Sequence, residues 1–60
     1  MNRIREVASE KKIKVEQIIR STGIAKSSMY QIINDEFEPS VSKALKIAKV
    51  LDSTVEELFI

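Results

Sequence analysis

The chain has 60 residues, of which 43% are hydrophobic, and this length predicts a single domain with one core over residues 1–60. It contains no cysteine and no histidine, which excludes disulfide bridges, thiolate nucleophiles and the usual zinc ligands, so we expect no metal and no cofactor. Ten Lys and Arg against nine Asp and Glu give a net charge of +1. Any affinity for a polyanion must therefore come from how charge is distributed.

The ends of the chain carry no targeting or membrane signal. The first twelve residues are charged and lack the apolar stretch of a secretory signal, and no apolar run approaches the roughly 20 residues of a membrane span. We expect a soluble, cytoplasmic protein without a membrane partner.

Helical spacing of apolar residues predicts two helices in the first part of the chain. The first covers about residues 2–11, and the second has about two turns and ends at Gly23, because glycine readily adopts a positive φ. The apolar positions are Ile4, Val7, Ala8 and Ile13 for the first helix, and Val15, Ile18 and Ile19 for the second.

A third, amphipathic helix is predicted over residues 25–34. Its apolar side carries Met29, Ile32 and Ile33. Its other side carries the polar residues Lys26, Ser27, Tyr30, Gln31 and Asn34. The helix therefore presents hydrogen-bonding groups with little negative charge.

Two more helices are predicted after the loop that ends at Pro39. Ser40 offers an N-cap for a helix that runs to about residue 51, and the pair Ser53 and Thr54, followed by Glu56 and Glu57, predicts the cap of a short last helix with acidic residues in its first turn. The apolar face of the fourth helix consists of Val41, Ala44, Leu45, Ala48 and Leu51, with Ile47 nearby. Lys43, Lys46 and Lys49 form a basic strip beside it, which is interpreted mainly as a solvated face.

These elements predict an all-α fold, a compact bundle of five short helices. The predicted core consists of Ile4, Val7, Ile18, Ile24, Met29, Ile32, Val41, Leu45, Ala48, Leu51 and Leu58. Phe59 and Ile60 exceed what one short chain would bury at its end, so we expect them to form a partner surface together with Val55.

Two short helices joined by a glycine turn, inside a bundle of five, resemble the phage-repressor and Cro-like (XRE-type) helix-turn-helix family over residues 4–60. The matching positions are Ile18, Gly23, Ile24, Ser27, Met29 and Ile32 in the helix-turn-helix, then Pro39, Ser40, residues 44–48, Leu51 and residues 55–58. The resemblance implies a lambda-repressor-like DNA-binding domain, bacterial or phage-encoded and nucleoid-associated. Such a domain binds a palindromic operator as a homodimer and regulates transcription, with repression as the expected sense.

The resemblance also implies which residues meet DNA. Lys26, Ser27 and Gln31 match the base-reading positions, with Ser28 and Tyr30 as second readers. The phosphate-binding positions are Lys14, Asn34, Ser40 and Lys43. No small-molecule substrate is expected.

Four departures from the family pattern bear on function. Val15 stands where many members have a Gln that contacts phosphate, and Ile19 is bulkier than the usual Ala. Ala8 and Ile33 stand where members often have an Arg–Glu pair, a joint replacement that can be neutral or stabilising. The loop after the third helix carries three carboxylates that would repel phosphate unless they point away from DNA: Asp35, Glu36 and Glu38.

Two other classes of function compete with a DNA-binding regulator. A helix-turn-helix fold that binds another protein, as an antirepressor does, is favoured by Val15 and by the acidic loop. An enzyme is not expected, because no spacing pairs a nucleophile with a base and a single glycine cannot form a phosphate-binding loop.

Overall fold

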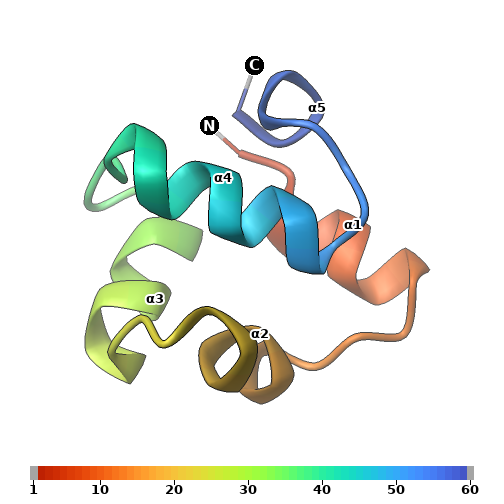
Figure 1. Cartoon of the computed structure of the whole chain (residues 1–60), viewed down its shortest axis with the longest axis horizontal. Coiled ribbons are helices and arrows are strands. Elements are labelled where there is room, and N and C mark those ends of the chain that lie inside the picture. Colours follow the sequence, from red (N-terminus) through yellow and green to blue (C-terminus); the bar gives the residue numbers. More distant parts are fainter. Residues whose placement is uncertain (1, 60) are drawn as a thin grey trace.

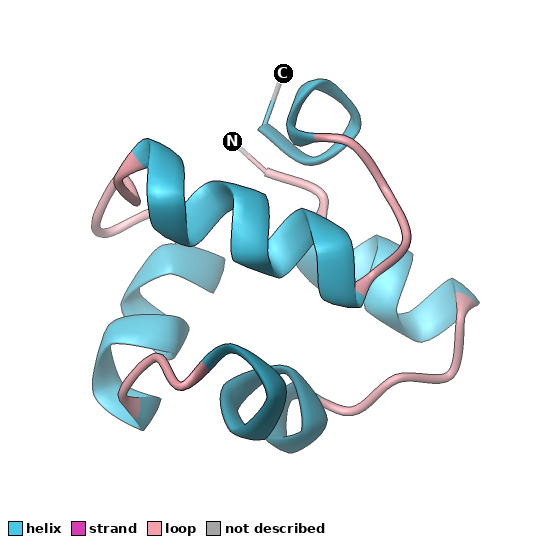
Figure 2. Ribbon diagram, in the orientation of Figure 1, coloured by secondary structure: helices cyan, strands magenta, loops and turns pink. Residues whose placement is uncertain are grey.

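Five helices form the fold, which a computed structural model describes over residues 2–59. They are α1 (Ile4–Glu10), α2 (Val15–Thr22), α3 (Lys26–Ile33), α4 (Val41–Val50) and α5 (Val55–Phe59). Figure 1 shows α4 running between α5 on one side and α2 and α3 on the other, and Figure 2 shows helices joined by short loops, with no strand among the described residues. The predicted all-α class and the five-helix order are confirmed. None of the described helices is long and apolar enough to cross a membrane.

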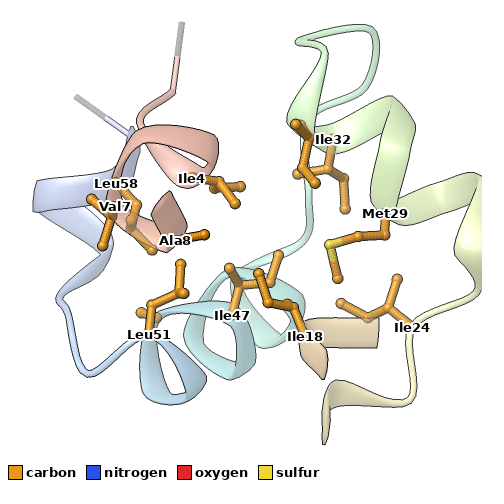
Figure 3. Packing of buried hydrophobic residues seen from close by; sticks show 12 residues of the cluster. Ile4, Val7, Ala8, Ile18, Ile24, Met29, Ile32, Ile47, Leu51 and Leu58 are labelled. Atoms are coloured by element: carbon orange, nitrogen blue, oxygen red, sulfur yellow. The ribbon is translucent and has the colours of Figure 1, made fainter. Parts of the chain in front are cut away.

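The core lies where α4 meets the other helices. α4 packs against α2 and α5, α1 packs against α5, and α2 packs against α3. Figure 3 shows the side chains of Ile4, Leu51 and Leu58 on one side of this core, with those of Met29 and Ile32 on the other and that of Ile47 between them. The largest fully buried side chains are Ile4, Ile18, Met29, Ile32, Ile47, Leu51 and Leu58. Nine of the eleven predicted core residues are buried.

The prediction was wrong for Val41 and Leu45, which are 76% and 56% exposed. The physical reason is the direction of their side chains around the helix axis. Each residue advances by about 100° around an α-helix, so the stripe centred on Ala44, Ile47 and Leu51 faces the core, while Val41 and Leu45 lie at one edge of it. Ile47, placed only near the core by the sequence, is instead at its centre.

Side-chain caps begin the last two helices, as predicted. The Ser40 Oγ accepts a hydrogen bond from the Lys43 N–H (3.3 Å) at the start of α4. At the start of α5, the Thr54 Oγ1 accepts from the Glu57 N–H (3.1 Å) and the Glu57 carboxylate accepts from the Thr54 N–H (3.0 Å). This reciprocal pair is a capping box, which satisfies two N–H groups that an α-helix leaves without partners.

Three helices end in a left-handed residue that is not glycine. Lys12, Asp35 and Asp52 have φ values of 57°, 59° and 51°, and they follow α1, α3 and α4. After α4, the Asp52 N–H donates to the Lys49 carbonyl (3.2 Å) and the Ser53 N–H donates to the Ala48 carbonyl (2.9 Å). This pair of bonds is the Schellman motif, and the residues after α1 and α3 make the same pattern. The sequence placed these helix ends to within about one residue, but it did not reveal the left-handed residue that follows each of them, because none is a glycine.

Replacing Asp52 by Gly should increase the free energy of unfolding by about 1 kcal/mol, because a side chain in the left-handed region costs about 1–2 kcal/mol and glycine avoids this strain. Chemical denaturation measures the change. Asp52→Ala is the matched control, since it removes the same carboxylate but keeps the Cβ, and it should give a smaller gain. An equal gain in both variants would assign the effect to charge at the helix C-terminus and not to backbone strain.

The chain before α1 ties that helix to the end of α5. The Arg3 N–H donates to the Leu58 carbonyl at 2.7 Å. The Arg3 side chain is exposed and donates through Nε to Glu6 at 2.7 Å, and this hydrogen bond raises the pKa of Arg3 above its ordinary value. Arginine is already protonated at physiological pH, so the contact orients the side chain without creating a pH-dependent group.

Candidate nucleic-acid interface

The turn between α2 and α3 is built by Gly23 and by the side chain of Thr22. Gly23 has a φ of 74°, and its N–H donates to the Ile19 carbonyl at 2.9 Å. The buried Thr22 Oγ1 donates to the Ile18 carbonyl (2.7 Å) and accepts from the Ile24 N–H (3.2 Å). Thr22 therefore holds the last turn of α2 and the first residue after Gly23 together. The sequence placed a turn here but did not identify this role of Thr22.

The side chain of Gln17 caps the start of α2. Its side-chain oxygen accepts a hydrogen bond from the Lys14 N–H at 2.9 Å. Lys14 itself is exposed just before the helix. An exposed lysine at the positive end of a helix can meet a phosphate, as predicted for this residue.

The outer side of α3 carries the predicted base readers. Lys26, Ser27 and Gln31 are exposed, whereas Met29, Ile32 and Ile33 on the opposite side are buried. Ser28 and Tyr30 are half-buried. Because Ser27 and Gln31 are four residues apart, they lie on the same face, one turn after the other. Every side chain that α3 exposes is a hydrogen-bonding group, and none is a carboxylate.

Two predicted phosphate contacts lie near the start of α4. Ser40 is exposed, and because its Oγ accepts from the Lys43 N–H, its hydroxyl proton is directed elsewhere and can be donated to a phosphate oxygen. Lys43 is half-buried, and its ammonium lies 5.8 Å from the centre of the Phe37 ring. This distance is typical of a cation–π contact, which holds the lysine beside the loop.

The C-terminal end of α3 is held by residues from the start of the chain. The Asn2 side-chain amide donates to the Ile32 carbonyl (2.8 Å) and to an Asp35 carboxylate oxygen (3.1 Å), while its oxygen accepts from the Ile4 N–H (3.1 Å). Asn2 thus joins the start of α1 to the end of α3. This contact spans 30 residues, and no local pattern in the sequence predicts it.

Asn34, predicted to contact phosphate, has a partner within the chain. Its side-chain oxygen accepts a hydrogen bond from the Arg5 guanidinium at 3.1 Å. Both residues are exposed, so Arg5 adds a positive charge beside this predicted contact. No local pattern in the sequence marks Arg5, because the two residues lie 29 positions apart.

Replacing Asn2 by Ala should lower the free energy of unfolding by about 1–2 kcal/mol, because the Ile32 carbonyl and the Ile4 N–H both lose a partly buried partner. Thermal unfolding followed by circular dichroism measures the loss. Asn2→Asp is the matched comparison, since it keeps the acceptor for Ile4 but places a carboxylate against a carbonyl and Asp35. Asn2→Asp should be at least as destabilising as Asn2→Ala. Unchanged stability in both variants would show that the hydrogen bonds of Asn2 to Ile32 and Ile4 do not stabilise the fold.

Two of the three loop carboxylates lie toward α5 and the N-terminal segment. Asp35 accepts from Asn2, and both residues border a hollow of about 300 Å³ whose wall also includes Phe37, Glu38 and Phe59. Glu38 borders a second hollow, beside Phe59 on α5. Asp35 and Glu38 therefore lie next to Asn2 and α5, not on the outer side of α3. Glu36 is exposed, and its backbone N–H donates to the Gln31 carbonyl (2.9 Å).

The unusual apolar residues of the chain belong to the interior. Ala8 and Ile33 are both buried, 3% and 6% exposed, so the pair that replaces an Arg–Glu contact forms part of the core. Val15 and Ile19 are half-buried and pack against the same core. At Val15, therefore, packing takes the place of the phosphate contact that a glutamine would provide.

The predicted dimer residues lie on α5 and at the end of the chain. Val55 and Phe59 are half-buried and pack against the core, while Ile60 lies outside the described residues. Between residues 2 and 59, no three acidic, cysteine or histidine side chains gather as a metal site would require.

Comparison with known proteins gives one informative match. A family model described as the Cro/C1-type HTH DNA-binding domain matches residues 3–60, nearly the whole chain. The match includes α2, the Gly23 turn and α3 in one alignment. Comparison with curated proteins gives no match. Comparison with solved structures gives none either.

Proposed function

Because the chain belongs to the Cro/C1-type HTH DNA-binding family, we propose that it is a sequence-specific transcriptional regulator that inserts α3 into the major groove of a palindromic operator. The observation that carries this proposal is the outer side of α3, where Lys26, Ser27 and Gln31 are exposed without any carboxylate. A solvated helix surface usually mixes both charges, whereas a surface that enters DNA carries little negative charge, because carboxylates are repelled by the phosphates.

In this proposal the exposed residues of α3 read base edges. The Lys26 ammonium donates to the guanine O6 and N7 acceptors, and the Gln31 amide bonds to the N6 and N7 of adenine. Ser27 has a hydroxyl that can donate or accept at short range. Ser28 and Tyr30 are half-buried, so they serve as secondary readers or as phosphate ligands at the edge of the same face.

Phosphate contacts would orient the domain on DNA without reading sequence. Donors are supplied by Lys14 before α2, by Asn34 and Ser40 in the loop between α3 and α4, and by Lys43 in the first turn of α4. The positions of Asp35 and Glu38 beside Asn2 and α5 support this arrangement, because two of the three loop carboxylates are then kept from the proposed DNA surface.

A palindromic operator requires two copies of the chain. The described residues measure 24 × 23 × 18 Å, whereas successive major-groove sites on one side of B-DNA are about 34 Å apart. One domain therefore reaches one half-site, and we propose a homodimer that uses Val55, Phe59 and Ile60. Repression follows if the operator overlaps a promoter, and the regulator would act at the nucleoid of a bacterial or phage-infected cell.

The dependence of DNA affinity on salt tests the proposal. Lys14→Ala should weaken binding to all sequences alike and reduce the slope of log affinity against log salt by about 0.9, the value for one phosphate contact. Fluorescence anisotropy with a labelled duplex at several salt concentrations measures both effects. Glu16→Ala is the control, since it alters an exposed neighbour that has no assigned contact.

The competing function, a protein-interaction module, makes the opposite prediction. It gives no salt-dependent affinity for DNA in the wild-type protein, and it places a partner on the acidic loop, where Phe37 is 45% exposed. Absence of DNA binding at low salt would therefore reject the regulator and favour this second function.

A further inference from the structure

Asn34 extends the outward-facing row of α3 by one turn. Ser27, Gln31 and Asn34 follow one another at intervals of four and three residues, so they share one face of the helix, and all three are exposed. Asn34 directly follows α3, and its φ of −88° and ψ of 11° keep it close to the helical path. The row is about 10 Å long, comparable with the width of the major groove. A helix that inserts its first turns into the groove therefore brings Asn34 to the edge, where the phosphates lie.

The end of α3 is by itself a poor place for an anion. The C-terminal end of a helix carries a partial negative charge, because its last carbonyl groups have no partner within the helix. Asp35 and Glu36 follow Asn34 directly and add two carboxylates. The neutral amide of Asn34 offsets none of this charge. A phosphate contact at this end of the helix therefore requires a nearby cation.

Arg5 on α1 supplies that cation. Its Nη2 donates a hydrogen bond to the Asn34 Oδ1 at 3.1 Å. Arg5 is exposed and forms no ion pair with another described residue, unlike Arg3, which donates to Glu6. A guanidinium has five N–H donors in one plane, so donors remain for a ligand after one is used by Asn34. This planar group matches the oxygens of a phosphate.

The same contact fixes the direction of the Asn34 amide. A guanidinium carries donors and no acceptor, so the atom turned toward Arg5 is the amide oxygen. The amide nitrogen of Asn34 then faces away from Arg5, and it donates to no other described residue. A phosphate oxygen accepts from such a nitrogen, whereas the reversed amide would present an oxygen that repels it.

We infer that Arg5 and Asn34 form one composite phosphate site, in which Arg5 supplies the charge and holds the Asn34 amide nitrogen toward the same phosphate. The inference deepens the proposed function, on which it rests for the insertion of α3 into the major groove. It gives α1 a role in DNA binding, although this helix lies outside the helix-turn-helix. Because Asn34 shares a face with Ser27 and Gln31, the site also fixes the register of these two residues on the bases.

Replacing Arg5 by Ala tests the charge of the site. With a labelled duplex of random sequence, Arg5→Ala should weaken binding about tenfold and reduce the slope of log affinity against log salt by about 0.9. Fluorescence anisotropy at several salt concentrations measures both effects. A slope equal to that of the wild-type chain would overturn the inference.

Lys11→Ala is the matched control for the loss of one positive charge. The Lys11 ammonium donates to the Asp52 carbonyl at 2.8 Å, at the end of α1 that lies away from α3 (Figure 1). This variant should keep the salt dependence of the wild-type chain. An equal reduction of the slope in Lys11→Ala and Arg5→Ala would assign the effect to net charge and overturn the site.

A double-mutant cycle tests whether the two side chains act as one site. Asn34→Ala should weaken binding about threefold, as expected for one neutral hydrogen bond. The double variant should bind about as weakly as Arg5→Ala alone, because Asn34 without Arg5 has neither a fixed direction nor a neighbouring cation. Independent contacts would multiply the two losses to about thirtyfold, and that result would overturn the composite site.

Asn34→Asp separates a phosphate contact from a purely structural bond. The carboxylate keeps an acceptor for Arg5, so the midpoint of thermal unfolding should change by less than about 5 °C. The carboxylate has no donor and neutralises Arg5, so binding to the same duplex should fall further than in Asn34→Ala. An Asp variant that binds DNA as tightly as the wild-type chain would show that the contact between Arg5 and Asn34 serves only stability.

The outcomes separate this inference from the proposed function. A wild-type chain that binds DNA with salt dependence, while Arg5→Ala leaves the slope unchanged, would retain the regulator and reject the composite site. A wild-type chain that binds no duplex at low salt would reject the regulator and the composite site together.

Discussion

Replacing Ile47 by Ala is expected to lower the free energy of unfolding by about 2–5 kcal/mol, because the side chain is fully buried and its removal leaves a cavity at the centre of the core. A 60-residue domain has a small core and a correspondingly small stability, so the variant should be largely unfolded near physiological temperature. Urea denaturation followed by circular dichroism measures the loss of stability. A variant that is already unfolded without denaturant also agrees with the expected loss.

Leu45→Ala provides the comparison on the same helix. Leu45 is 56% exposed in the single chain, so its truncation should lower stability by less than about 1 kcal/mol when measured at a low micromolar concentration, where association contributes little. Equal losses in the free energy of unfolding for Leu45→Ala and Ile47→Ala would contradict the exposure of Leu45 and the burial of Ile47 on α4.

Replacing Gln31 by Ala is expected to weaken binding to the preferred operator by about 1–3 kcal/mol and to relax the preference at one base pair per half-site, because the amide can bond two atoms of one adenine. Affinity for non-cognate duplexes should change little, since Gln31 is uncharged and releases no counterion. Binding titrations against the operator and its single-base-pair variants measure the effect.

Lys14→Ala is the matched control for Gln31→Ala, because a phosphate contact affects every sequence equally. Equal losses across all duplexes for both variants would show that Gln31 does not read a base. Unchanged stability of the Gln31 variant is expected, since the side chain is exposed and makes no hydrogen bond to another described residue.

Local chemistry is the part of the fold that could be predicted from sequence. Gly23 marks the turn because of its freedom at positive φ, and Ser40 and Thr54 mark helix starts because their hydroxyls accept backbone N–H bonds. The left-handed Lys12 could not be predicted, because lysine gives no signal for that conformation, and Asp52 tolerates it without marking it as glycine does.

Contacts between distant segments could not be predicted either. Asn2 and Arg5 hold the end of α3 across about half of the chain, and residue spacing carries no information on such contacts. An apolar stripe in the sequence likewise does not show whether the core of its own chain reaches it. The sequence therefore assigned Val41 and Leu45 to the core, although the core of one chain does not reach them.

The candidate site was predictable in part for the same reasons. Amphipathic spacing predicted which residues of α3 face outward, and exposure confirms this for Lys26, Ser27 and Gln31. The positions of the loop carboxylates depended on Asn2 and on the left-handed Asp35, so they required the structure. The roles of these residues toward DNA remain predictions that binding measurements decide.

Selection from a randomised duplex pool at two salt concentrations, with the bound sequences read out, tests whether the chain is a sequence-specific DNA-binding regulator. We expect enrichment of a short palindrome, with half-sites about 34 Å apart and an affinity that falls steeply as salt rises. No enrichment at low salt would contradict it, and the acidic loop around Phe37 would then be the first surface on which to look for a protein partner.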